Sequence, residues 1–232
     1  MSISSPLIDF HAHILPGVDH GSVGIEESLK QLELMNRAGI DTVVATPHFY
    51  PHEHKVEEHL LKVKKAEEAL KNRPLQTPRI CIGAEVLYCD GLEYMERLDE
   101  LCIQGTNVLI LELPTGPWSY QLFDTVYCLR HSYTVVLAHV DRYLPMHAQE
   151  IDHLLGNGVL AQINTDSLSG LISSKRTMPF FLHDRTVALG SDLHQANAKT
   201  YRRFLSARKR FIVAFDNIMP RSAKLLENAK TI

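Results

Sequence analysis

The sequence predicts an α/β fold in which seven parallel strands alternate with crossover helices, as in a (β/α) barrel, and two observations favour it. Seven short apolar runs recur along the 232 residues, separated by segments with helical periodicity. Six of the seven runs end in histidine, aspartate or glutamate. Because the carboxyl ends of barrel strands converge on one face, these polar residues are expected to meet in one pocket of a single domain, residues 1–232.

The first run, residues 7–13, carries two histidines at strand spacing. Side chains alternate along a strand, so His11 and His13 project from the same face. A Pro-Gly turn then returns two further potential ligands, Asp19 and His20, towards the same end. An isolated His-x-His pair is more often structural than metal-binding, and the remaining runs decide between the two.

The next three runs also end in polar residues. The second stops at a proline followed by His48, the third ends in Glu85, and the fourth places Glu112 two residues before a proline. A carboxylate within an apolar run is unfavourable unless a cation balances it. These runs span residues 40–48, 79–86 and 107–114.

The last three runs complete the pattern. The fifth delivers His139 and then Arg142, and the seventh places Asp192 and His194 on one face, as in the first run. The sixth ends in amides and hydroxyls from Asn164 onward, so it is expected to support the site without supplying a ligand. These runs span residues 133–143, 186–194 and 159–164.

Helical periodicity predicts the segments that cover the strands. His52, His54 and His59 lie in the first turns of the second helix and are expected on a solvated face, with roles facing the substrate as the weaker alternative. The basic residues after Lys199 are likewise expected to be solvated, with a docking surface for an acidic partner as the weaker alternative. The expected helices are 24–39, 52–72, 92–101, 119–131, 147–155, 172–183 and the region from 199 onward.

Composition narrows the function further. A net charge of −3 argues against a general nucleic-acid binder, and four cysteines without Cys-x-x-Cys spacing argue against a disulfide scaffold. No apolar run approaches the ~18–20 residues that span a bilayer, so a cytoplasmic, soluble protein is expected. Thirteen histidines indicate metal or acid–base chemistry. The residues expected to form a joint metal site are His11, His13, His48, Glu85, Glu112, His139, Asp192 and His194.

These residues stand in motifs that resemble a known superfamily, the polymerase and histidinol phosphatase (PHP) superfamily. Two segments, residues 13–19 and 139–143, more narrowly resemble the metal-dependent protein-tyrosine phosphatases of bacterial capsule and exopolysaccharide operons. The motifs are His11-Ala-His13, Thr46-Pro47-His48, Gly83-Ala-Glu85, Leu111-Glu112-Leu-Pro114, Ala138-His139-Val-Asp-Arg142-Tyr143 and Ser191-Asp192-Leu-His194.

The resemblance implies a distorted seven-stranded (β/α)7 TIM-like barrel, the PHP fold, with two to three divalent ions, Mn²⁺ or alternatively Fe or Zn. It implies three ligand sets, of which the first two share Glu85. It also implies that Arg142 binds the phosphate. The implied substrate is a phosphotyrosine protein, such as the tail of a bacterial tyrosine kinase. The implied sets are His11, His13, Glu85 and Asp192; His48, His139 and Glu85; and Glu112, His194 and His20.

Two positions depart from the family pattern. His20 stands where the family has aspartate, so it can coordinate a metal but adds no negative charge. Lys199 stands where a second phosphate-binding arginine is usual, and lysine lacks the bidentate fork of a guanidinium. The change at position 20 affects the third metal site, and the change at position 199 affects how the substrate is oriented.

Metal-assisted phosphoester hydrolysis fits these residues. Arg142 and Lys199 would stabilise the phosphoryl oxygens, and His48 or His194 would protonate the leaving phenolate. The four cysteines lack the Cys-x5-Arg arrangement of a thiol phosphatase. The alternatives are a small-molecule phosphatase of the histidinol-phosphate type, a nuclease or amidohydrolase of the other His-x-His barrels, and a metal-binding regulatory module that has lost turnover.

Overall fold

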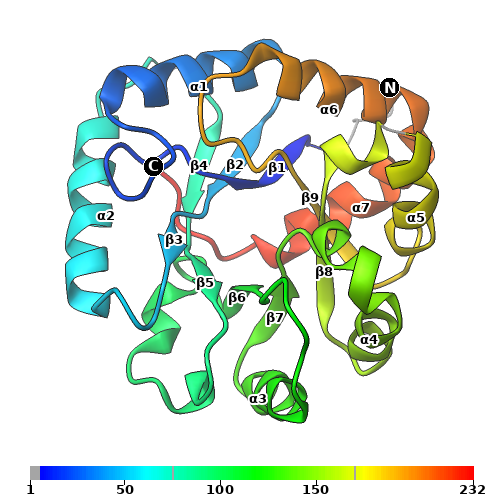
Figure 1. Cartoon of the computed structure of the whole chain (residues 1–232). Helices are drawn as coiled ribbons and strands as arrows, with labels where there is room; N and C mark the ends of the chain where they lie inside the picture. Colours follow the sequence, from blue (N-terminus) through cyan, green and yellow to red (C-terminus); the bar gives the residue numbers. More distant parts are fainter. Residues whose placement is uncertain (1–5, 75, 170) are drawn as a thin grey trace.

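Strands and helices alternate along the chain in the computed structural model, which describes residues 6–74, 76–169 and 171–232 (Figure 1). Every strand pair is parallel, as expected when helices connect successive strands. One sheet has the order β1 (Ile8–Ala12), β2 (Thr42–Ala45), β4 (Arg79–Ile82). The other has the order β3 (His48–Phe49), β5 (Glu85–Leu87), β6 (Val108–Glu112), β7 (Thr134–Leu137), β8 (Leu160–Asn164), β9 (Thr186–Gly190).

Two of the seven expected runs are each divided into two strands, so the described residues form nine strands. The break between β2 and β3 falls at Pro47, which has no N–H to donate to a neighbouring strand. The break between β4 and β5 falls at Gly83 and Ala84, whose N–H groups donate to Ala45 and Leu101. Each divided run passes from one sheet into the other, and the two sheets are therefore continuous along the chain.

The first strand and the segment after the last strand lie side by side. The N–H of His13 donates to the carbonyl of Leu193 at 2.9 Å, and the N–H of Asp192 donates to that of His11 at 2.8 Å. A Cβ at Gly190 would lie 2.6 Å from the Cβ of His11, so only glycine permits this approach. These contacts bring the His-x-His and Asp-x-His motifs together.

Helices lie around the outside of the strands (Figure 1). The expected helix over 92–101 is instead two 3₁₀ segments, η1 (Leu92–Tyr94) and η2 (Leu98–Leu101), because Arg97 between them adopts a left-handed conformation, φ 65°. In the described residues no helix is long and apolar enough to span a membrane. The α-helices are α1 (Ile25–Arg37), α2 (Val56–Leu70), α3 (Tyr120–Leu129), α4 (Leu144–Gly156), α5 (Leu171–Phe181), α6 (Ala198–Arg210) and α7 (Ile212–Leu225).

The basic helix α6 has the expected amphipathic arrangement. Tyr201, Phe204 and Ala207 are buried along one stripe, while the arginines and lysines between them are exposed or half-buried. Arg203 forms an ion pair with Asp166 at 2.6 Å. The stripe joins this helix to the core and leaves its charges in solvent.

His59 corrects the expectation of a solvated histidine face. The helix α2 begins at Val56, so His52 and His54 precede it, and His59 is buried together with Val63. The His59 ring packs edge-on against Phe49, with ring centroids 5.3 Å apart. The period of the helix places residue 59 on the same face as the apolar positions, and that face is turned towards the strands.

The burial of His59 makes stability depend on pH. Burial lowers the pKa of His59 to about 4, so between the ordinary value and pH 4 the unfolded chain takes up a proton that the folded chain does not. Stability is therefore lost as the pH falls from about 6.5 to 4. We expect His59→Gln to reduce the difference in unfolding free energy between pH 7 and pH 4.5 by about 2 kcal/mol, measured by urea denaturation. Replacing the exposed His52 by glutamine serves as the control, and equal pH dependence in both variants would contradict the assignment.

Candidate metal centre

Glu85, the first residue of β5, lies at the centre of a buried group of histidines. Its Oε2 is 3.1 Å from Nε2 of His11 and 3.1 Å from Nδ1 of His48. The same oxygen is 3.4 Å from Nε2 of His13, and Oε1 is 2.6 Å from Nε2 of His139. Five ionisable groups that are distant in sequence therefore share one small volume, because strands β1, β3 and β5 and the end of β7 deliver them to the same face.

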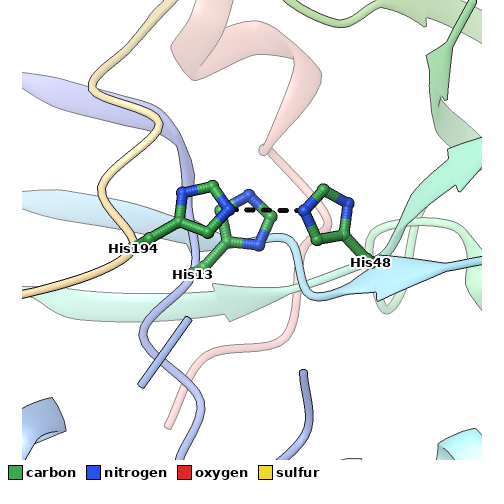
Figure 2. Close-up of side chains that lie close together, drawn as sticks. All are labelled: His13, His48 and His194. Carbon is green, nitrogen blue, oxygen red and sulfur yellow. Dashed lines mark hydrogen bonds between the residues drawn. The ribbon is translucent and has the colours of Figure 1, made fainter. Parts of the chain in front are cut away.

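Three overlapping sets of side chains have the spacing of a metal site. In each set, one potential ligand atom from every residue lies within 4.8 Å of the others. Figure 2 shows the first set, in which His13, His48 and His194 approach one another and Nε2 of His48 lies 3.3 Å from Nε2 of His194. The sets are His13, His48 and His194; His11, His13 and Asp192; and His48, Glu85 and Glu112.

Backbone strain coincides with this cluster. His139 has φ 31° and Asp192 has φ 52°, and among the described non-glycine residues only Arg97 also has positive φ. Such conformations cost on the order of 1–3 kcal/mol each and persist where the surroundings hold them. Each of these residues lies two positions after the end of a strand, β7 for His139 and β9 for Asp192. The left-handed backbone there changes the direction of the chain and turns the side chain into the cluster.

The charges of the cluster are mutually dependent. Burial would raise the pKa of Glu85, but His11 and the other histidines hold it well below its ordinary value. Burial would lower the pKa of His13, but hydrogen bonds to Asp19, Asp192 and Glu85 raise it well above that value. Burial and the repulsion of Glu85 raise the pKa of Glu112. The carboxylates thus depend on nearby positive charge for their ionised state.

Unpartnered polar atoms test whether the cluster fits a metal. Nδ1 of His11, Nδ1 of His48 and Oδ1 of Asp192 are buried without a hydrogen-bond partner in the described part of the chain. The 3.1 Å contact between His48 and Glu85 lacks hydrogen-bond geometry. Leaving a buried polar atom unpaired costs about 1–3 kcal/mol, and a cation bound by such an atom would remove that cost. Imidazole nitrogens with carboxylate oxygens suit Mn, Fe or Zn. The donor set therefore fits divalent ions.

Asp19 orients two of the histidines from behind. Its Oδ2 lies 2.7 Å from Nδ1 of His13 and accepts a 2.9 Å hydrogen bond from the backbone N–H of His48. Its Oδ1 accepts from the N–H of Gly21 at 2.9 Å. The sequence placed Asp19 near the site as a further potential ligand, whereas the structure uses its carboxylate to hold the His13 ring with Nε2 directed into the cluster.

We expect Asp19→Asn to weaken metal binding about 10–100-fold, because the amide cannot supply the charge that fixes the His13 tautomer. The measurement is a competition titration against a metal-sensitive fluorescent chelator. Asp124→Asn, at an exposed position of α3, is the matched control. Metal affinity equal to that of the parent chain would contradict this role for Asp19.

Other supporting side chains come from β8 and from the segment that follows β7. Gln162 accepts a 2.6 Å hydrogen bond from the backbone N–H of His139, and Asn164 donates one of 3.0 Å to Asp192. The hydroxyl of Tyr143 lies 3.3 Å from Nδ1 of His139. The strand β8 was expected to support without ligating, and Gln162 and Asn164 are the side chains through which it contacts the cluster.

Arg142 and His20 lie at the rim of the cluster, and Lys199 is carried by α6. Arg142 hydrogen-bonds Asp192, and its Nη1 is 3.2 Å from Nε2 of His139. His20 is exposed, with its ring stacked 4.7 Å from that of His48 and 4.8 Å from that of His194. Lys199 is exposed in the first turn of α6, and within the described ranges its amino group has no hydrogen bond or ion pair. Sequence spacing alone could not place Lys199.

The family model for capsular polysaccharide synthesis proteins CpsB/CapC matches residues 7–209. The tyrosine-protein phosphatase CpsB of Streptococcus pneumoniae is 28% identical over 211 residues, covering 83% of this chain and 85% of that protein. The tyrosine-protein phosphatase YwqE of Bacillus subtilis (strain 168) is 27% identical over 178 residues, covering 73% of this chain and 68% of that protein.

Solved structures share the fold. A structure described as YwqE from Bacillus subtilis and CpsB from Streptococcus pneumoniae, unique metal-dependent tyrosine phosphatases, matches with a TM-score of 0.77 at 22% identity, covering 97% of this chain and 96% of that one. The histidinol phosphate phosphatase of Lactococcus lactis, complexed with zinc, L-histidinol and phosphate, matches with a TM-score of 0.55 at 12% identity, covering 88% and 93%. With the family match extending over most of its length, the chain belongs to the CpsB/CapC family of capsular polysaccharide synthesis.

Proposed function

We propose that this chain is a metal-dependent phosphoester hydrolase, and specifically a protein-tyrosine phosphatase. The observation that carries the proposal is the buried cluster around Glu85, with Arg142 at its rim. The CpsB and YwqE relatives are named as tyrosine-protein phosphatases, which supports the same reaction here. The substrate is then a phosphotyrosine protein, such as a bacterial tyrosine-kinase tail, met in the cytoplasm.

The proposed ligands comprise three sets, of which the first two share Glu85. His11, His13, Glu85 and Asp192 hold one ion, and His48, His139 and Glu85 hold a second. Glu112, His194 and His20 hold a third, for which the stacking of His20 on His48 and His194 is the supporting contact. Two to three Mn²⁺ ions, or Fe or Zn in their place, would occupy these sets. When bound, such ions act as Lewis acids on the phosphoryl group and acidify water.

The remaining residues act on the substrate. Arg142 binds the phosphoryl oxygens through its planar guanidinium, which matches the edge of a phosphate. Lys199 contributes charge from the first turn of α6. His48 or His194 protonates the leaving phenolate, and the His194 side chain is the more accessible of the two, with 28% exposed against 8%.

The architecture that holds these residues is proposed as one domain, residues 1–232, in the form of a distorted barrel. The parallel bridge between Ala12 and Leu193, next to β1 and β9, supports closure between the first and last strands. Closure brings ligands from both ends of the chain to one pocket. A barrel also explains why seven apolar runs supply the strands although two runs are divided.

The test is phosphate release from a phosphotyrosine peptide and from histidinol phosphate by chelator-stripped protein, with and without Mn²⁺. We expect metal-restored turnover of the peptide, and none in the His13→Ala variant. Preference for histidinol phosphate would instead indicate a small-molecule phosphatase, the alternative that fold likeness to the Lactococcus lactis enzyme favours. Metal binding without turnover of either compound would indicate a regulatory module.

A further inference from the structure

A groove of about 520 Å³ adjoins the metal cluster. It lies between the segment after β3 and the segment after β6, and its size falls within the ~300–1,000 Å³ range of small-molecule sites. Tyr50, Pro51, Tyr88, Leu113 and Pro114 supply most of its apolar lining. A concave surface of this composition suits a planar aromatic group.

The groove and the cluster share Glu112. This carboxylate lines the groove, while its Oε1 lies 3.6 Å from Nε2 of His139 and its Oε2 lies 4.0 Å from Nδ1 of His48. The Tyr50 ring stacks on the His48 ring with centroids 5.3 Å apart. A molecule in the groove therefore reaches the cluster directly, along the side formed by β3 and β6.

A second opening on the cluster has a different character. It measures about 350 Å³ and lies beside the N-terminus of α6, lined chiefly by polar side chains such as Asp192, His194, Gln195 and Asn197. This opening suits water, a phosphate oxygen or a polar chain rather than a ring. Of the two openings, only the groove offers aromatic walls in the described part of the chain.

The walls of the groove are held in place. The Trp118 indole donates to the carbonyl of Pro114 at 2.8 Å, and Nε2 of His147 donates to that of Gly116 at 2.9 Å. The Trp118 and His147 rings stack with centroids 4.0 Å apart and 7° between their planes. Tyr88 donates its N–H to the carbonyl of Glu112 at 2.8 Å. Fixed walls reduce the entropy lost when a ligand is ordered against them.

We infer that this groove is the aryl subsite of the enzyme, and that Tyr50 and Tyr88 are the residues that select aryl phosphates over alkyl phosphates. The inference rests on the proposed function and adds the residues that bind the aryl ring of the substrate. The aryl ring of the substrate packs among the aromatic and apolar walls, while its phosphate is bound at the cluster beside Glu112.

The experiment compares Tyr50→Leu and Tyr88→Leu on phenyl phosphate and ethyl phosphate, in metal-loaded protein whose metal content is measured. We expect the ratio of kcat/KM for phenyl phosphate to that for ethyl phosphate to fall about tenfold in each variant, since an aromatic pair contributes roughly that factor beyond area burial. Tyr50→Phe and Tyr88→Phe keep the ring and should retain the ratio. Tyr94→Leu, at a position 82% exposed and outside the groove, is the matched control.

Binding supplies a second readout that does not require turnover. Benzylphosphonate and ethylphosphonate, which cannot be hydrolysed, are titrated into the same proteins by calorimetry. We expect the leucine variants to lose about tenfold in affinity for benzylphosphonate only. Unchanged ratios, or equal losses for both phosphonates, would overturn the aryl subsite. If the parent protein hydrolyses neither phosphate, the proposed function fails, and the phosphonate titration still decides whether the groove selects aryl groups.

Discussion

Glu85→Gln is expected to reduce kcat/KM for phosphoesters by on the order of 10³-fold, because metal-ion catalysis supplies several kcal/mol that this substitution removes. The Glu85 carboxylate lies within 3.4 Å of nitrogen atoms in four histidines. A glutamine fills the same space but lacks the charge that two neighbouring ions would share. The measurement pairs steady-state kinetics with the number of metal ions bound per chain.

Two comparisons make the Glu85 result specific. Glu33→Gln, at the exposed Glu33–Arg37 pair of α1, should leave both metal content and activity unchanged. Circular dichroism of the metal-free Glu85→Gln protein should show that it still folds, since the substitution changes charge and not volume. A variant that binds its full complement of metal and turns over at the parent rate would remove Glu85 from the centre of the site.

Arg142→Ala is expected to lower kcat/KM about 10²–10³-fold without unfolding the protein, the usual cost of deleting one charged or polar donor to a reacting oxyanion. Its guanidinium lies at the rim, with Nη1 3.2 Å from His139 and 3.8 Å from Glu112, and its side chain is 42% exposed. Such a position leaves donors for an incoming phosphoryl group. Arg142→Lys should recover only part of the loss, because an ammonium cannot form the bidentate contact.

The control for Arg142 is Arg203→Ala on α6, where the arginine pairs with Asp166. This variant should retain parent kinetics. Inorganic phosphate inhibition gives a binding readout, and we expect the inhibition constant to rise in Arg142→Ala. Parent values for both kcat/KM and phosphate inhibition in Arg142→Ala would show that another group binds the phosphoryl oxygens.

Strand ends were the part of the site that sequence could predict. The eight residues at the ends of six runs were expected to converge, and the structure brings all of them into one cluster. The reason is general, because parallel strands with crossover helices share one carboxyl edge and alternation fixes which residues face inwards. The position of each apolar run and the polar residues at its end were sufficient to predict the cluster.

Tertiary contacts decided what sequence could not. His59 has helical spacing compatible with solvent or core, and only the packing of α2 against Phe49 buries it. The sequence predicts Asp19 as a potential ligand in a loop. Only the fold of residues 13–21 brings its carboxylate into contact with Nδ1 of His13 and the N–H of His48. Lys199 was identified by its distance in sequence from the Asp192-Leu-His194 motif. The direction of its side chain depends on the helix α6 that carries it. Local sequence does not specify these orientations.

A metal titration of chelator-stripped protein tests most simply whether this cluster is the catalytic metal centre. Bound Mn²⁺ and phosphate release are measured in the same samples. We predict no release from a phosphotyrosine peptide without metal, and activity that rises as two or more tight sites per chain fill. The Glu85→Gln protein should neither fill those sites nor become active. Full activity in the stripped protein, or activity independent of the bound metal, would contradict the account.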